Sequence, residues 1–151
     1  MAESQIQTDD FSDIRDAVRS LCQGFPGEYW REKDRNREYP REFVQALTDS
    51  GFLAVLIPEA YGGSGLGIRE ASAILEEIHK SGCNGAACHA QMYIMGTLLR
   101  HGSEEQKKKY LPGIASGALR LQAFGVTEPG SGTDTTSIRT FAKKEGDGYV
   151  I

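Results

Sequence analysis

The sequence predicts a mainly α-helical fold, with a helical domain over residues 1–118 and the first strands of a β domain over residues 119–151. Two observations lead to this fold class. Apolar residues recur every three or four positions up to about residue 118, as on one face of a helix, and beyond it they alternate with polar residues, as in strands. Since so few strands cannot form a stable sheet alone, we expect an incomplete second domain and a longer parent protein.

The composition favours a folded, water-soluble protein. Apolar residues make up 39% and charged residues 25% of the chain, which is typical of globular domains. The net charge of -4 provides no basic surface for nucleic acid or anionic lipid, so neither is expected as a partner. The acidic start resembles neither a secretion signal nor a transit peptide, and Cys22, Cys83 and Cys88 form no disulfide framework. We therefore expect a cytoplasmic protein with reduced thiols.

Two helices are expected in the first third of the chain. The first runs from a cap at Thr8 to Cys22, with its apolar residues on one face. The second has Pro40 in its first turn and ends at Gly51. The charged stretch around Trp30, between these helices, is expected to be exposed.

A short apolar run, Phe52–Ile57, ends at Pro58, and the glycine-rich segment 62–67 follows as a flexible surface loop. The third helix turns Ala71, Ile74, Leu75 and Ile78 inward and ends at Gly82. The fourth spans about Gly85 to Arg100 and carries almost no charge, which predicts a central helix buried on all sides.

The fifth helix begins at Ser103, which has capping-box spacing to Gln106, and Pro112 predicts a break or kink. Strands are then expected over residues 119–124 and from Ile138 up to Gly146. A turn at Gly146-Asp147-Gly148 joins the second strand to residues 149–151 as a hairpin.

Two apparent sites have plainer explanations. The glycines of segment 62–67 lack the spacing of a dinucleotide-binding loop, because Ile68 stands where a glycine is required. His79, Cys83, Cys88 and His89 are potential zinc ligands, but the short paired spacings of structural zinc sites are missing. A core or pocket-lining role is therefore favoured over a metal site.

Segment 125–137 is the most informative part of the sequence. It is rich in glycine and hydroxyl residues and follows an expected strand, so its backbone N–H groups could approach a flat or anionic ligand. The alternative is a turn-rich connection in which Glu128 and Asp134 satisfy local backbone donors. The residues by themselves leave both interpretations open.

The same segment resembles the signature of the acyl-CoA dehydrogenase family. The similarity covers Phe124-Gly125-Val126-Thr127-Glu128-Pro129-Gly130-Ser131-Gly132-Thr133-Asp134 and extends to Ser137. Three other stretches resemble the family in its order and at its spacing: Gly51-Phe52-Leu53, Pro58-Glu59-Ala60-Tyr61-Gly62-Gly63 and the segment from Gly102 to Pro112.

The resemblance implies a fold and a set of ligands. The family has an amino-terminal helical domain, a middle β-barrel-like domain and a carboxy-terminal helical domain, usually in a homotetramer. It implies FAD as cofactor and an acyl-CoA as substrate, with Thr133 touching the substrate and His89 and Tyr93 of the fourth helix lining the acyl pocket. The residues implied to bind FAD are Phe124, Gly125, Val126, Thr127, Gly132 and Thr133.

The reaction implied by the resemblance is α,β-dehydrogenation of the acyl-CoA, with electrons passed to an electron-transferring flavoprotein or a similar acceptor. The family's base is a carboxylate in the carboxy-terminal domain, so this chain is expected to be inactive alone. Glu128 is expected to brace its own loop. A sister flavoenzyme, either an acyl-CoA oxidase or a flavin monooxygenase, and a non-catalytic helical interaction module remain alternatives.

Overall fold

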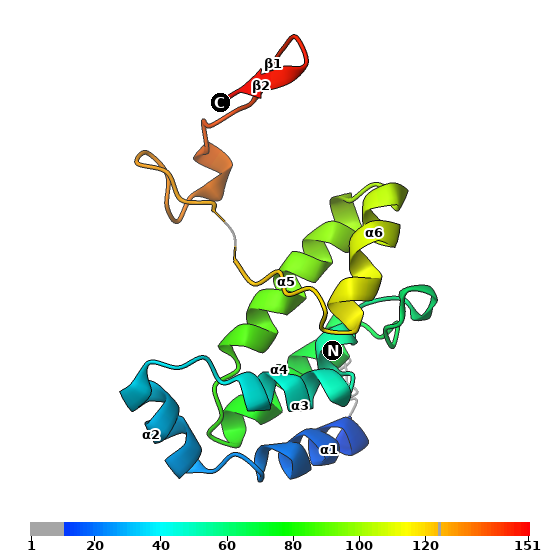
Figure 1. Ribbon diagram of the computed structural model, residues 1–151, viewed down its shortest axis with the longest axis vertical. Coiled ribbons are helices and arrows are strands. Elements are labelled where there is room, and N and C mark those ends of the chain that lie inside the picture. The colour runs from blue at the N-terminus through cyan, green and yellow to red at the C-terminus, as the bar shows by residue number, and fades with distance from the viewer. Residues whose placement is uncertain (1–10, 124) are drawn as a thin grey trace, which may run out of the picture.

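The computed structural model describes residues 11–123 and 125–151 and shows a mainly helical protein, as predicted. Six α-helices form one body, and the remaining chain leaves it as an extended arm that ends in a hairpin (Figure 1). The elements are α1 (Ser12–Cys22), α2 (Gly27–Asn36), α3 (Arg41–Asp49), η1 (Phe52–Ala54), η2 (Glu59–Tyr61), α4 (Ile68–Lys80), α5 (Ala86–His101), α6 (Glu104–Ala115), η3 (Thr135–Ser137), β1 (Lys143–Glu145) and β2 (Gly148–Val150).

The hydrophobic core lies entirely within the helical body. Its buried side chains come from α1, α3, α4, α5, α6, the η1 segment and the connections that follow η1 and α4. They form one cluster that includes Val18, Leu47, Ile78, Met95 and Leu111. Removing such apolar surface from water is the main force that holds helices of this length together. The inward face predicted for the third helix is confirmed, since Ala71, Ile74 and Ile78 of α4 are buried.

Helix α2 occupies the charged stretch around Trp30, for which the sequence predicted exposure but no helix. The helix buries no residue completely, so it lacks the apolar stripe by which a helix is recognised in a sequence. It is held by an aromatic cluster instead. The Trp30 ring lies edge-on to Phe43 with centroids 4.9 Å apart, and its indole N–H donates to the Phe25 carbonyl over 3.0 Å.

Helix α5 is not buried on all sides, contrary to expectation. Cys88, Gln91, Met92 and Met95 are buried, whereas the opposite side of the helix is exposed at several positions. An uncharged surface is therefore not the same as a buried one: small and neutral polar side chains form the outer face of this helix.

Helix α6 begins as predicted but does not end at its proline. The Ser103 hydroxyl accepts from the Gln106 amide over 3.2 Å, and the Gln106 side chain accepts from the Ser103 amide over 2.8 Å. Of the break or kink expected at Pro112, a break does not occur, because the helix continues to Ala115. Burial of Leu111 and Ile114 on either side of Pro112 offsets the loss of one backbone hydrogen bond.

The glycine-rich segment 62–67 lies at the surface, as expected, and is hydrogen-bonded through its backbone to the residues before it. The Gly65 amide donates to the Ile57 carbonyl over 2.8 Å, and the Leu66 amide donates to the Val55 carbonyl over 2.9 Å. Gly63 lies so close to the Ile57 carbonyl that an added Cβ atom would be 2.1 Å from its oxygen. Backbone hydrogen bonds and close packing thus fix this turn.

The predicted carboxy-terminal hairpin is confirmed. Strands β1 and β2 pair antiparallel with Lys143 opposite Val150, and Gly146 has the positive φ of 59° that the turn requires. The strand expected at 119–124 is wrong in the part of the chain described, where that segment pairs with no neighbour. The strand expected from Ile138 up to Gly146 is shorter than predicted, because only Lys143–Glu145 pairs. A strand needs a hydrogen-bonded partner, which alternation in a sequence cannot supply.

No helix in the described ranges is long and apolar enough to cross a membrane.

Candidate functional site

Segment 125–137 folds into a compact loop with its own hydrogen bonds. Glu128 and Ser131 exchange backbone hydrogen bonds of 3.1 and 3.0 Å, which close a tight turn around Pro129 and Gly130. Ser131 is the buried residue of this turn, and its hydroxyl donates to the Asp134 carbonyl. The loop therefore has a defined shape although it makes few contacts with the helical body.

Two carboxylates brace the loop from inside. Glu128 accepts from the Arg139 amide over 2.6 Å, from the Thr140 amide over 3.0 Å, and also from the Thr140 hydroxyl. These bonds, the Thr140 hydroxyl first, lower the pKa of Glu128 from its ordinary value of 4.5. Asp134 accepts from Ser137 and Thr136, which likewise lower its pKa. Glu128 thus braces its own loop, as the sequence suggested.

The outer edge of the loop carries hydrogen-bonding groups that have no partner within the described residues. The amides of Val126 and Thr127 donate no hydrogen bond within the part of the chain that the structure describes. The exposed hydroxyls of Thr127 and Thr133 also have no hydrogen bond there. No atom lies within 4 Å of a Cβ added at Gly125 or Gly132, so a flat ligand could approach the backbone. Phe124, also predicted as a site residue, lies outside the described residues.

A groove of about 470 Å³ lies along the amino-terminal half of α5. His89 and Tyr93 both line it, with ring centroids 5.2 Å apart in an edge-to-face contact, so the structure brings these two predicted residues together. Gly85 caps α5 and is buried, and a Cβ at Gly85 would lie 2.8 Å from the His79 ring. The other residues lining the groove are Tyr39, Pro40, Asn84, Ala86, Ala87, Ala90 and Gln122.

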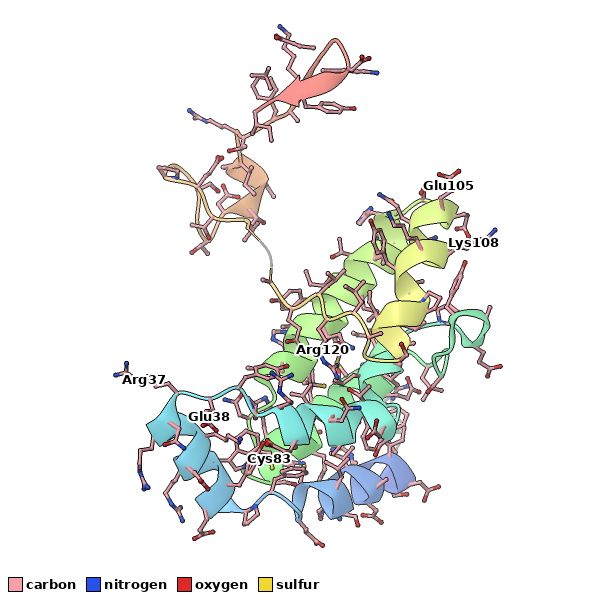
Figure 2. The ribbon with its side chains drawn as sticks, viewed as in Figure 1. Arg37, Glu38, Cys83, Glu105, Lys108 and Arg120 are labelled. Atoms are coloured by element: carbon pink, nitrogen blue, oxygen red, sulfur yellow. The ribbon has the colours of Figure 1, made fainter. Side chains whose placement is uncertain are left out.

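Polar side chains fasten the segment before the loop to the helical body. The Gln122 side chain accepts from the Tyr39 hydroxyl over 2.9 Å and donates to the Ala87 carbonyl of α5 over 3.2 Å. Arg120 reaches into the helical body (Figure 2), where it donates to the Thr48 hydroxyl over 2.9 Å. Because the loop begins a few residues later, these bonds determine where it leaves the groove.

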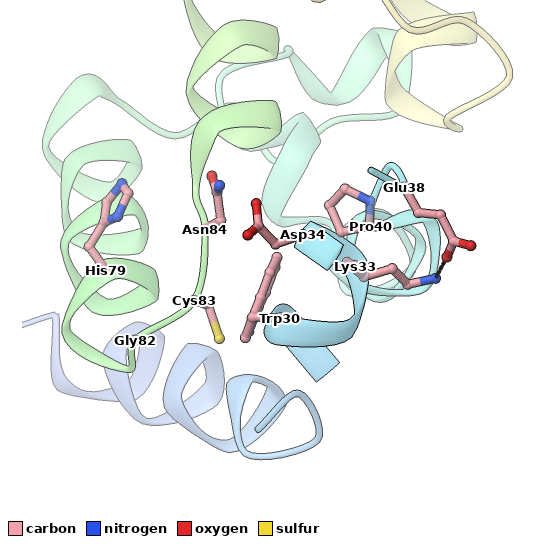
Figure 3. A pocket seen from close by; sticks show the side chains of 9 residues that line it. All are labelled: Trp30, Lys33, Asp34, Glu38, Pro40, His79, Gly82, Cys83 and Asn84. Carbon is pink, nitrogen blue, oxygen red and sulfur yellow. Dashed lines mark hydrogen bonds and ion pairs between the residues drawn. The ribbon is translucent and has the colours of Figure 1, made fainter. Parts of the chain in front are cut away.

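A second hollow, of about 550 Å³, separates α2 from the connection between α4 and α5 (Figure 3). Trp30 and Asp34 face Cys83 and Asn84 across it, and Lys33 donates to Glu38 at its rim over 3.1 Å. None of the residues predicted to bind cofactor or substrate lines this hollow.

Histidine, cysteine and acidic side chains do not gather into a metal site in the described residues. The three cysteines are free and buried. Burial raises the pKa of the Cys88 thiol to about 12, which keeps it protonated at neutral pH. Cys88 therefore behaves as a small core residue.

Comparison with known families shows the family to which the chain belongs. The family model described as "Acyl-CoA dehydrogenase, N-terminal domain" matches residues 8–118, which is most of the chain. This chain belongs to the acyl-CoA dehydrogenase family. The resemblance drawn from the sequence is thereby confirmed.

Individual acyl-CoA dehydrogenases match nearly the whole chain. FadE12, an acyl-CoA dehydrogenase of Mycobacterium tuberculosis, is 36% identical over 149 residues, covering 98% of this chain and 38% of that protein. Bovine mitochondrial isovaleryl-CoA dehydrogenase is 36% identical over 143 residues, covering 91% of this chain and 33% of that protein. The chain thus spans less than two fifths of the length of these relatives.

The solved structures agree on the fold. An acyl-CoA dehydrogenase from Geobacillus kaustophilus superposes with a TM-score of 0.77 at 27% identity, covering 98% of this chain and 39% of that one. Its similarity supports the assignment of a helical amino-terminal domain followed by the start of a β domain.

Sequence reasoning did not identify Tyr39 and Gln122 as groove residues. They lie 83 positions apart and meet only through the fold. The single local signal was the polar side chain of Gln122 within the expected first strand. This signal is not specific, because polar residues occupy any strand position that faces solvent. Their pairing belongs to the tertiary structure alone.

Proposed function

We propose that this chain is the amino-terminal part of an FAD-dependent acyl-CoA dehydrogenase, which forms a double bond between the α and β carbons of an acyl-CoA thioester. The observation that carries the proposal is the loop segment 125–137 of a family member, with free amides at Val126 and Thr127 and open approaches at Gly125 and Gly132. Membership of the family supports the reaction type.

The free groups of the loop fit the polar edge of a flavin ring. In this proposal the amides of Val126 and Thr127 and the Thr127 hydroxyl donate to ring acceptors, while Gly125 and Gly132 leave room for the ring. Phe124 and Thr133 complete the cofactor-binding set. When bound, FAD supplies a two-electron acceptor for the hydrogen leaving the β carbon.

The substrate would lie between the loop and α5. Thr133 is proposed to touch the acyl-CoA with its free hydroxyl, and His89 and Tyr93 to line the space for the acyl group. Glu128 is not proposed as the base, because three hydrogen bonds from Arg139 and Thr140 already occupy its carboxylate. The base would come from outside this chain, so residues 1–151 by themselves should show no turnover.

Two partners follow from the same proposal. The reduced cofactor requires an electron acceptor, for which an electron-transferring flavoprotein is the proposed partner. We also propose that the whole protein is a homo-oligomer, which would cover apolar side chains such as Phe141, exposed by 73% in this chain.

The experiment compares Thr127→Val with Thr135→Val in the full-length protein. Thr127 offers a free hydroxyl at the proposed flavin edge, and its loss should weaken FAD binding about 2- to 10-fold, the usual range for one hydrogen bond. Thr135 is also exposed in the same loop and serves as the matched control, with no expected change. FAD binding is measured by flavin absorbance and fluorescence titration of the apoprotein.

Two results would contradict the proposal. One is a full-length protein that binds no flavin, and the other is a flavoprotein that no acyl-CoA thioester reduces under anaerobic conditions. Rapid reoxidation of the reduced protein by oxygen would instead identify an oxidase of the same family.

A further inference from the structure

The groove along α5 is unusual for a space that holds a fatty chain, because its walls are rich in rings and polar groups. Tyr39, His89 and Tyr93 contribute three rings, and Asn84 and Gln122 contribute two amides. Ala86, Ala87 and Ala90 provide a floor of small side chains, so the groove is wide between these rings. Its lining offers flat surfaces for stacking as well as hydrogen-bonding atoms.

Most of these polar groups are already satisfied within the protein. Gln122 uses both ends of its amide, on the Tyr39 hydroxyl and the Ala87 carbonyl. The Asn84 side chain accepts from the Ala86 amide over 2.9 Å. His89 differs from them: its exposed imidazole forms no hydrogen bond within the described residues, and it contacts the Tyr93 ring edge-to-face. The imidazole is therefore available to a ligand.

A straight alkyl chain would fit this lining poorly. It would cover the His89 imidazole without offering a hydrogen bond, and a polar group that loses its water without a new partner is penalised. A ring could lie against the edge-to-face pair of His89 and Tyr93, where aromatic contacts add to simple burial. An oxygen on that ring would give His89 the partner that it lacks.

We propose that the acyl group of the substrate carries a ring with a hydrogen-bonding oxygen, and that His89 is the residue that selects it. This inference rests on the proposed function, because it assumes that the α5 groove receives the acyl end of an acyl-CoA. It adds the class of acyl group and assigns its recognition to one side chain.

The test uses the full-length flavoprotein with three thioesters: octanoyl-CoA, 3-phenylpropanoyl-CoA and 3-(4-hydroxyphenyl)propanoyl-CoA. The two phenyl compounds isolate the effect of the ring oxygen, and octanoyl-CoA isolates the effect of the ring. For the natural sequence, kcat/KM should rise in the order octanoyl, phenylpropanoyl, hydroxyphenylpropanoyl, with at least a tenfold difference between the first and the last.

Three variants assign the preference to His89. His89→Leu should lower the ratio of kcat/KM between the hydroxyphenyl and phenyl compounds about tenfold, a change of about 1.4 kcal/mol. His89→Gln keeps a hydrogen-bonding side chain and should retain most of that ratio. His101→Leu makes the same substitution at an exposed position at the end of α5, outside the groove, and should leave the ratio unchanged. Flavin content and thermal unfolding verify that each variant is folded.

The outcomes separate this inference from the function on which it rests. Dehydrogenation of octanoyl-CoA as fast as, or faster than, that of the ring compounds would overturn the inference and leave the proposed function standing. An unchanged hydroxyphenyl-to-phenyl ratio in His89→Leu would also overturn it. If no thioester reduces the flavin, the proposed function itself fails, and the inference with it.

Discussion

Among single residues, Glu128 shows how a carboxylate close to a proposed active site can be structural. Its hydrogen bonds to Arg139 and Thr140 tie the start of the loop to the chain that leaves it, over a separation of 11 and 12 residues. The bonds favour the ionised form, so the pKa of Glu128 lies below 4.5. The tie should consequently be present at neutral pH and be lost in acid.

We predict that this tie follows the protonation of Glu128. A carboxylate with a lowered pKa contributes stability above its ordinary pKa of 4.5, and that contribution is lost as the pH falls through the lowered value. Hydrogen exchange at the Arg139 and Thr140 amides should therefore become faster relative to other amides in acid. In Glu128→Gln it should be faster already at pH 7. Glu145→Gln, an exposed change in β1, is the control, and equal protection in both variants would contradict the prediction.

Glu77 is a buried acid of α4 that links this helix to α1. Its carboxylate, 5% exposed, accepts from Arg19 of α1 over 2.8 Å and lies 3.7 Å from an Arg15 nitrogen. Glu77→Gln should lower the free energy of unfolding by about 1–3 kcal/mol, because a partly buried charge network loses its acid. Urea unfolding of the chain measures this change.

Glu76 provides a matched control for Glu77. It pairs with Arg15 and Lys80, each over 2.7 Å, but its side chain is 48% exposed. Since exposed ion pairs contribute little, Glu76→Gln should cost no more than about 1 kcal/mol. Equal effects of the two substitutions would show that burial does not set the strength of this α1–α4 contact.

At the scale of elements, the turn after η2 depends on the absence of a side chain at Gly63. A Cβ there would lie 2.1 Å from the Ile57 carbonyl and 2.6 Å from the Ala54 carbonyl, both backbone atoms that cannot rotate away. Gly63→Ala should thus destabilise the chain by about 2–3 kcal/mol. Gly130→Ala, with no atom within 4 Å of the new Cβ, should stay within about 0.5 kcal/mol. Thermal unfolding measures the stability of both variants. An equal loss of stability in the two would contradict this explanation.

The elements that the sequence predicted well have local causes. Ser103 and Gln106 are three positions apart, and the capping box that they predict is present because it needs nothing beyond its own helix turn. Helix α2 was missed for the opposite reason. Its stability depends on the contact of Trp30 with Phe43, a residue of another helix, which its own hydrophobic pattern does not record.

For the whole molecule, the structure predicts that the helical body is stable without the arm. The buried apolar residues fall between Val18 and Ile114, whereas Phe141 and Tyr149 of the arm are 73% and 67% exposed. Residues 1–123 should therefore unfold with a free energy within about 0.5 kcal/mol of that of residues 1–151. Chemical denaturation measures both chains.

A shorter chain serves as the contrast. Ending at residue 110 removes the buried side chains of Leu111 and Ile114, each worth several kcal/mol in a packed core, so this chain should be severely destabilised. If removing residues 124–151 were as harmful as removing residues 111–151, the arm would carry stability that the described contacts do not explain.

The sequence alone determined the family, the helical character of residues up to about 118, the hairpin and the supporting role of Glu128, because signature, periodicity and turn residues are properties of neighbouring positions. Only the tertiary structure decided that α2 is a helix, that one side of α5 stays open, and that Tyr39 and Gln122 close the groove beside His89. Those outcomes depend on contacts between segments far apart in the chain. Their energy comes from burial and hydrogen bonding that exist only once the segments have met.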